Sequence, residues 1–138
     1  MKFRNRQFGE IEFEEDHLVR FPAGIIGFDE YRKFLIVNDD DTQPFRWLVS
    51  VEDEELSFPL LDPDLLTEGY TGRLKGSADS TVFLIAALHE QAERSTANLR
   101  SPIIIDNRTR EARQVILDDE SLPLQYPLSR PAHAAPGA

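Results

Sequence analysis

Apolar residues recur mostly at every second position, in short runs that turn-forming residues separate. Ile11 and Phe13, for example, alternate with Glu10, Glu12 and Glu14, as in a strand with one face in water. Roughly eight to ten such runs fit into the chain, with few helical segments between them. The pattern therefore predicts a mainly all-β fold, a small antiparallel β-barrel with one or two short helical segments.

Two stretches should form the centre of this fold. The run TVFLIAALH (81–89) is continuously apolar and β-branched, which predicts a strand buried on both faces. The segment 96–117 predicts a hairpin with arms at Pro102–Asp106 and Arg113–Leu117, whose three consecutive isoleucines (103–105) should lie in the core. Pro59 cannot donate a ladder hydrogen bond, so its strand is expected at an edge or a bulge.

The length of 138 residues fits one domain, predicted to span residues 1–121. Residues 122–138 are rich in Pro and Ala and have no hydrophobic period, so they are expected to form a flexible C-terminal tail. Asp62 and Pro63 are suited to the cap and first position of a short helix.

Several classes of chemistry receive no support from the sequence. Cysteine is absent, and no apolar run approaches the roughly 18 residues that span a bilayer. Residues 1–10 contain no apolar signal-peptide core, so a cytoplasmic protein without membrane contact is expected. The three histidines lie far apart, and no nucleophile or phosphate-loop motif occurs. We expect no enzyme activity, no metal and no cofactor.

The strongest remaining signal is negative charge. The chain carries a net charge of −10, which disfavours direct binding of nucleic acid. Acidic residues gather in four short clusters, at residues 10–16, 39–41, 52–55 and 118–120. Two or more clusters could share one rim of a barrel and attract a basic partner. The alternative is that the acidic turns only keep the protein soluble.

Three sequence blocks resemble those of the flagellar assembly factor FliW family. FPAGIIGFDEYRKF (21–34) resembles F-x-x-G-[LI]-x-G-F-[DE]-x-x-x-x-F, and PFRWLVSVEDEELSFPLLDP (44–63) and TANLRSPIIID (96–106) resemble two further family segments. They occur in the family's order. The chain departs from the pattern at Ile25–Ile26, which replace Leu-Pro, in a short linker at 74–82, and in its Pro/Ala tail.

The resemblance implies a small β-barrel that binds proteins. Such proteins antagonise the carbon storage regulator CsrA, a dimeric RNA-binding protein that represses translation of flagellin mRNA. They also bind flagellin, which presents an amphipathic helical terminus, and the two partners exclude each other. The alternative is a flagellin chaperone that does not antagonise CsrA.

The candidate partner-binding residues follow from the charge pattern and from the third block. Asn98 could instead satisfy a neighbouring loop, and Asn107 could instead be a left-handed turn residue. The full set is Asp39, Asp40, Asp41, Glu52, Asp53, Glu54, Glu55, Asn98 and Asn107.

Overall fold

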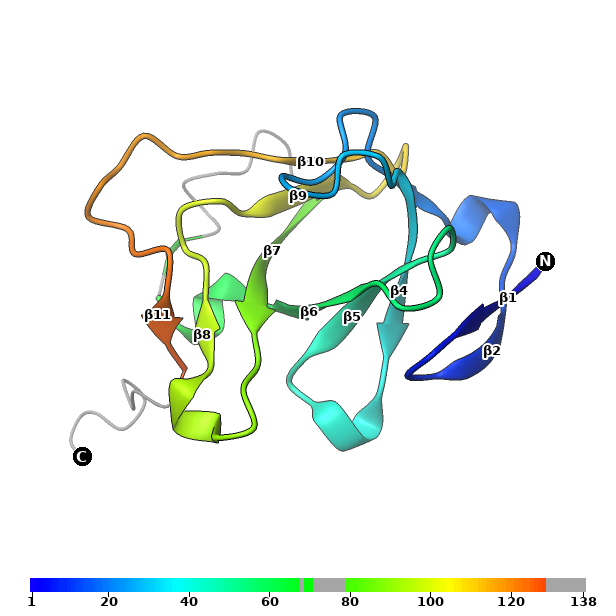
Figure 1. Ribbon diagram of the computed structural model, residues 1–138. Coiled ribbons are helices and arrows are strands. Elements are labelled where there is room, and N and C mark those ends of the chain that lie inside the picture. The colour runs from blue at the N-terminus through cyan, green and yellow to red at the C-terminus, as the bar shows by residue number, and fades with distance from the viewer. Residues whose placement is uncertain (68, 71–78, 129–138) are drawn as a thin grey trace.

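The computed structural model describes residues 1–67, 69–70 and 79–128 (Figure 1). It contains one curved, antiparallel sheet in the order β10-β9-β7-β6-β5-β4-β3, with β8 and β11 as a side branch and β1-β2 as a separate hairpin. The strands are β1 (Lys2–Asn5), β2 (Gly9–Glu12), β3 (Val19–Arg20), β4 (Lys33–Asn38), β5 (Arg46–Ser50), β6 (Ser57–Leu61), β7 (Ser80–Ala87), β8 (Thr96–Ala97), β9 (Ile103–Asp106), β10 (Ala112–Gln114) and β11 (Tyr126–Pro127). The mainly antiparallel all-β fold is confirmed.

The described helices are 3₁₀ segments of three residues each: η1 (Glu15–His17), η2 (Asp40–Thr42), η3 (Pro63–Leu65) and η5 (Ala92–Arg94). The described chain thus has more short helical turns than the one or two expected. At η3 the prediction is confirmed, because the Asp62 side chain accepts the N–H of Asp64 and Pro63 occupies the first position.

Strands β4, β5 and β6 form a meander in which each pairs antiparallel with the next. Pro59 pairs with Trp47 of β5, whereas β7 pairs only with Leu60 and Leu61 of β6. Pro59 therefore lies where β6 has a strand on one side only, and its missing N–H costs no ladder bond on the other side.

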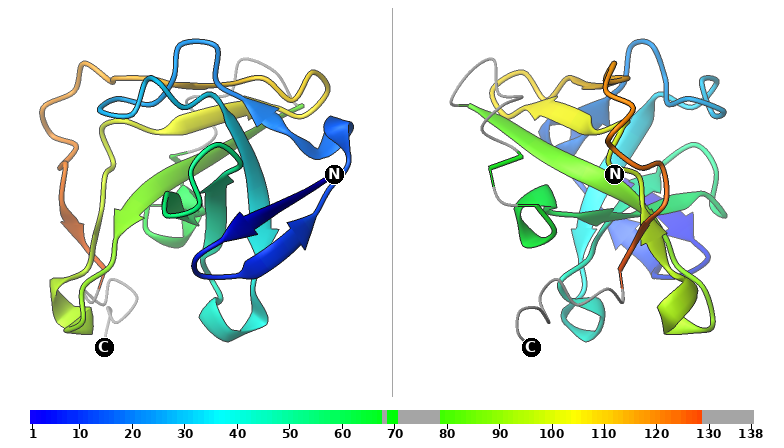
Figure 2. Two further views of the ribbon diagram at one scale, coloured as in Figure 1. Left: turned by 45° about the vertical axis from the view of Figure 1, so that its right-hand side comes forward. Right: turned by 90° about the vertical axis from the view of Figure 1, so that its left-hand side faces the viewer.

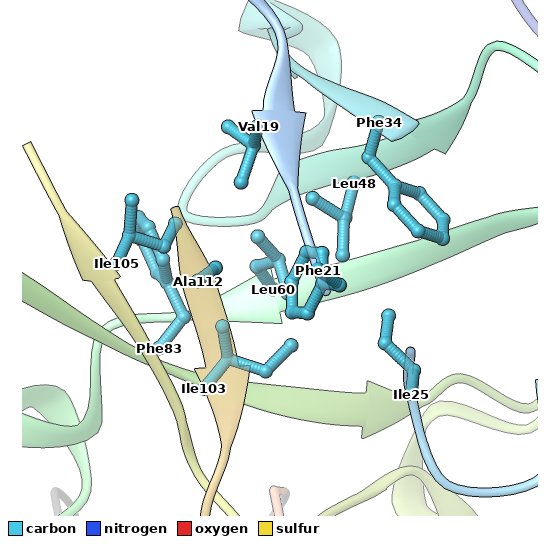
Figure 3. Packing of buried hydrophobic residues seen from close by; sticks show 10 residues of the cluster. All are labelled: Val19, Phe21, Ile25, Phe34, Leu48, Leu60, Phe83, Ile103, Ile105 and Ala112. Carbon is cyan, nitrogen blue, oxygen red and sulfur yellow. The ribbon is translucent and has the colours of Figure 1, made fainter. Parts of the chain in front are cut away.

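Strand β7 is the hub of the sheet, since its first half pairs with β9, its centre with β6 and its end with β8. Successive side chains of a strand point to opposite faces. Phe83 accordingly packs in one core cluster and Val82 and Leu84 in another. In β9, Ile103 and Ile105 join the first cluster (Figure 3) and Ile104 joins the second. The predicted two-sided burial and the core role of the isoleucines are confirmed.

The second core cluster extends beyond the predicted domain boundary. Tyr126 pairs with Ala97 of β8, and Leu122, Tyr126 and Leu128 pack against the buried cluster around Leu84 and Leu99. Residues 122–128 therefore pack as part of the fold, because they cover an apolar face of β8 and β9 that would otherwise meet water. Residues 129–138 and the linker segment 71–78 lie outside the described residues, so the flexible tail stays a prediction for 129–138.

The sheet curls so strongly that its two end strands, β3 and β10, approach each other (Figure 2). Among the described strands no continuous ladder closes the barrel. Arg20 of β3 forms an isolated parallel bridge with Glu111, which immediately precedes β10. The predicted barrel is thus an open, strongly curved sheet whose two ends meet at one bridge.

Candidate protein-binding surface

The turn between β5 and β6 contains four acidic residues, and hydrogen bonds to a buried side chain hold its backbone in place. The buried hydroxyl of Ser50 accepts the N–H groups of Glu52, at 3.0 Å, and of Asp53, at 3.1 Å. The Asp53 carboxylate accepts the N–H of Glu55 at 3.0 Å. Because a buried serine holds the turn, the backbone from which these acidic side chains project is set by the fold.

The four carboxylates of this turn have different local roles. Glu52 accepts the backbone N–H groups of Arg32, at 2.7 Å, and of Lys33, at 3.1 Å. Glu55 pairs with the Arg6 guanidinium at 2.6 Å, with both side chains exposed. Within the described residues, the Glu54 carboxylate makes no hydrogen bond or ion pair. Glu54 is therefore the carboxylate of the turn that a partner's cation could reach without displacing a contact made by the fold.

An exposed aromatic patch borders this turn. The Tyr31 hydroxyl is hydrogen-bonded to the Asp53 carboxylate, which raises the pKa of Tyr31, and the charge of Glu30 raises it further. The Tyr31 N–H donates to the Phe28 carbonyl at 3.1 Å. The Phe28 ring packs edge-on against Phe58, with centroids 5.2 Å apart, yet remains 38% exposed.

This combination suits a partner that carries arginine. A guanidinium group can stack on an aromatic face and pair with a carboxylate at the same time. Exposed aromatic side chains are also typical of the centres of protein interfaces. The sequence analysis missed Ile26 and Phe28 as surface residues. Their signal was their place on either side of Gly27 and close to Gly24, because glycines in such close succession favour a turn, where an apolar side chain has little core to reach.

The second acidic cluster, Asp39–Asp41, lies in the turn between β4 and β5. Asp39 accepts the N–H of Asp41 at 3.1 Å and the hydroxyl of Thr42 at 3.2 Å, and Thr42 accepts the indole N–H of Trp47 at 2.9 Å. This turn lies at the opposite end of β5 from Glu52–Glu55, roughly 17 Å away along a five-residue strand. These two clusters therefore do not share a rim.

The two candidate asparagines also lie apart, before and after β9. The Asn98 side-chain oxygen accepts the N–H groups of Arg100, at 2.9 Å, and of Ser101, at 3.1 Å, so it satisfies the neighbouring loop. Asn107 is exposed, and its amide exchanges hydrogen bonds with the Thr81 hydroxyl. The idea that Asn107 is a left-handed residue is wrong, because that conformation falls on Arg110, with φ of 64°.

The described residues contain no group of three or more His, Asp or Glu arranged to hold a metal ion. No helix among them has the length and apolarity needed to cross a bilayer. What the fold presents is a small, curved antiparallel β domain with an acidic turn beside the exposed ring of Phe28 and the half-buried ring of Tyr31. This is the general class of a compact β scaffold with a surface suited to protein recognition.

Comparison with known proteins identifies the family to which the chain belongs. The model of the FliW protein family matches residues 2–128, so the chain belongs to the FliW family. A flagellar assembly factor FliW from Caldicellulosiruptor saccharolyticus is 36% identical over 133 residues, which covers 89% of this chain and 87% of the relative. One from Thermosipho africanus is 34% identical and covers 94% and 96% of the two chains.

A solved structure gives the same result at the level of the fold. The crystal structure of a flagellar assembly factor FliW superimposes with a TM-score of 0.82 at 29% sequence identity. The match covers 93% of this chain and 96% of that one. The resemblance drawn from the three sequence blocks is therefore confirmed.

Proposed function

We propose that this chain acts by binding two proteins, the translational regulator CsrA and flagellin, and not by catalysis. In this proposal it works in the cytoplasm, where it sequesters CsrA and so relieves repression of flagellin mRNA translation. Flagellin competes for the chain until flagellin is exported. Membership of a family of flagellar assembly factors supports the proposal.

The observation that supports CsrA binding is the acidic Glu52–Glu55 turn on a chain with a net charge of −10. A protein that binds RNA must carry basic groups to neutralise phosphates. The turn offers Glu54 without a competing contact among the described residues, and exposed Phe28 lies close by. Complementary charge of this kind raises encounter rates and suppresses wrong partners.

Mutual exclusion needs only that each partner weaken the binding of the other. By thermodynamic linkage the two effects are equal in free energy. Hence the proposal does not require CsrA and flagellin to contact the same residues. Asp39–Asp41, Asn98 and Asn107 stay candidate contacts on other parts of the surface.

The test is calorimetric titration of the chain with CsrA from the same bacterium, at low and at high ionic strength. We expect binding that weakens as salt rises. Glu54→Lys should weaken it about tenfold, which corresponds to about 1.4 kcal/mol. Glu90→Lys is the matched control, because it changes the net charge by the same amount at an exposed site outside the four acidic clusters.

Two results would contradict this half of the proposal. Equal losses in the Glu54 and Glu90 variants would mean that only net charge matters. A lack of CsrA binding at either salt, with flagellin binding intact, would leave the second candidate function, a flagellin chaperone without CsrA antagonism. The observation that favours the chaperone is an apolar groove on a different part of the molecule, lined by Phe45, Leu61, Leu65 and Leu88.

A further inference from the structure

The hairpin β1–β2 lies at the periphery of the molecule, beside the main sheet (Figure 1). Among the described residues, β2 pairs with β1 alone. The Met1 amine donates to the Phe13 carbonyl at 2.9 Å, and the Phe13 N–H donates to the Met1 carbonyl at 2.8 Å. In an antiparallel pair, hydrogen-bonded and non-hydrogen-bonded residue pairs alternate. The backbone N–H and C=O groups of Glu10 and Glu12 therefore point away from β1, along a free edge.

A buried side chain holds the shape of this hairpin. Asn5 is 2% exposed, and its side-chain oxygen accepts the N–H groups of Gln7, at 2.8 Å, and of Phe8, at 2.9 Å. The outer side of β1 is tied to the rest of the fold, because the Arg6 N–H donates to the Glu54 carbonyl at 2.8 Å. The edge of β2 is thus ordered before a partner arrives, which lowers the entropic cost of pairing with it.

The apolar side chains on one face of the hairpin are only partly covered. The rings of Phe3 and Phe13 meet edge-on with centroids 5.7 Å apart, and Ile11 of β2 lies opposite Phe3. All three side chains are half-buried, and none belongs to either core cluster. A strand added beside β2 would place every second side chain on this face and cover more of its apolar surface.

The opposite face of the hairpin determines which charge such a strand should carry. Glu10 and Glu12 project from it, and the Lys2 ammonium of β1 lies 3.9 and 3.7 Å from their carboxylates. Exposed ion pairs of this length contribute little, so both carboxylates stay available to cations on the open side of β2. A second copy of β2 would place glutamate against glutamate, and like charges directly opposite destabilise a strand pair. The edge therefore favours a basic segment over a second copy of the chain.

We propose that the free edge of β2 binds an extended segment of a partner protein in which basic residues alternate with apolar ones. The segment adds a third strand to the hairpin by pairing with the backbone of Glu10 and Glu12. Its basic side chains lie against the two carboxylates, and its apolar side chains lie against Ile11 and Phe13. Main-chain hydrogen bonds supply the affinity, and the alternation supplies the specificity. This site does not depend on the proposed function, because a different acidic cluster carries it.

The probe is the capped peptide acetyl-Lys-Val-Lys-Val-Lys-amide, titrated into the isotopically labelled full chain and followed by NMR. The amide resonances of Glu10 and Glu12 should shift, and their hydrogen exchange should slow as the peptide saturates the edge. The matched control peptide has glutamate in place of each lysine and keeps the same apolar pattern. It should leave both amides unchanged, because it places like charges beside the edge.

Two substitutions at Glu12 separate the contribution of charge from that of the backbone. Glu12→Gln keeps the outward N–H and should weaken peptide binding about threefold. Glu12→Pro also removes the outward N–H, yet it spares the bonds to β1, and should weaken binding about tenfold. Glu90→Gln is the control for net charge at an exposed site and should bind the peptide as wild type does. Thermal unfolding checks that each variant folds; if the proline variant does not, Glu12→Gln and the NMR shifts decide.

Three results would overturn the proposal. Amides of Glu10 and Glu12 that neither shift nor gain protection, or that respond equally to the glutamate peptide, would show that the edge does not select a basic strand. Shifts confined to the Glu52–Glu55 turn would show that the peptide binds there only as a cation. Protection of the two amides that rises with protein concentration and without peptide would assign the edge to a second copy of the chain.

Discussion

The backbone N–H of Arg20 donates to the carbonyl of Arg110 at 3.0 Å, and this bond joins the two ends of the curved sheet. Arg110 is the non-glycine residue with positive φ among the described residues. Its guanidinium donates to the His17 carbonyl at 2.9 Å, which ties the β9–β10 turn to η1. The contact that brings the sheet ends together therefore depends on a residue in a conformation that L-amino acids rarely adopt.

This geometry predicts that Arg110→Gly will be more stable than Arg110→Ala. Both variants lose the contact with His17, but only glycine adopts positive φ without steric cost. The expected difference in the free energy of unfolding is about 1 kcal/mol, measured by urea denaturation. Equal stability of the two variants would show that the left-handed conformation costs nothing here.

Gly24 should be far less tolerant of alanine than Gly27. Both have positive φ, at 75° and 86°. A Cβ on Gly24 would lie 2.7 Å from the backbone oxygen of Asp29, whereas a Cβ on Gly27 would meet nothing within 4 Å. Gly24→Ala should cost about 3 kcal/mol and Gly27→Ala about 1 kcal/mol. Similar losses in denaturant unfolding would mean that the loop moves away from Asp29 easily.

The fold class could be predicted from the sequence because strand periodicity and turn residues are local signals. The hairpin around Ile103–Ile105 and the position of Pro59 follow from the same signals. The division of β7 among three partner strands could not be predicted, since it depends on contacts between residues far apart in the chain. Which residue of the β9–β10 turn takes positive φ was also beyond the sequence, because Asn favours that conformation and Arg does not.

The candidate surface was predictable only in outline. The sequence shows that Glu52 and Glu54 are acidic neighbours, but not that Glu52 caps two backbone N–H groups of another strand. Likewise, the sequence alone suggests that Phe28 is a core aromatic residue, whereas the structure shows that it is exposed near the turn. Such roles depend on tertiary contacts, which a local pattern does not contain.

Asp106 should make the stability of the β9–β10 hairpin depend on pH. Its carboxylate accepts the N–H groups of Thr109 and Arg108, which lowers the pKa of Asp106 below the ordinary value of 3.8. Because the pKa is lowered by folding, the charged group contributes stability above about pH 4, and this contribution is lost as pH falls through the folded pKa. Asp106→Asn should remove this part of the acid sensitivity.

The measurement is urea denaturation of wild type and Asp106→Asn between about pH 6 and about pH 2.5. The wild type should be the more stable at the upper end, and the difference should shrink at the lower end. A constant difference across the range would show that the charge of Asp106 is not what holds the turn.

The two candidate asparagines should differ in their effect on folding. Asn98 is half-buried and caps two N–H groups, so Asn98→Ala should cost about 1 to 2 kcal/mol. Asn107 is exposed and contacts Thr81, so Asn107→Ala should cost about 0.5 kcal/mol or less. If Asn98→Ala were neutral for stability but weakened partner binding, Asn98 would be an interface residue and not a structural cap.

The segment 122–128 should prove necessary for the fold. The Leu99 N–H donates to the Pro123 carbonyl at 3.0 Å, the Leu128 N–H to the Ser95 carbonyl at 2.9 Å, and Arg100 to the Leu122 carbonyl at 2.9 Å. Removing the segment would leave these groups unpaired and expose the second core cluster. With three half-buried apolar side chains lost, a chain ending at residue 121 should be less stable by about 3 to 5 kcal/mol.

A chain ending at residue 128 is the control for this truncation. The sequence predicts a flexible tail, and that expectation now applies to residues 129–138. Thermal and urea unfolding of this variant should therefore match the full chain within about 0.5 kcal/mol. If the chain ending at 121 were equally stable, β11 would contribute nothing to the fold and the boundary predicted at residue 121 would stand. Loss of stability only on removal of 122–128 would instead place the boundary at Leu128, because that residue would then be the last to bury apolar surface against the second core.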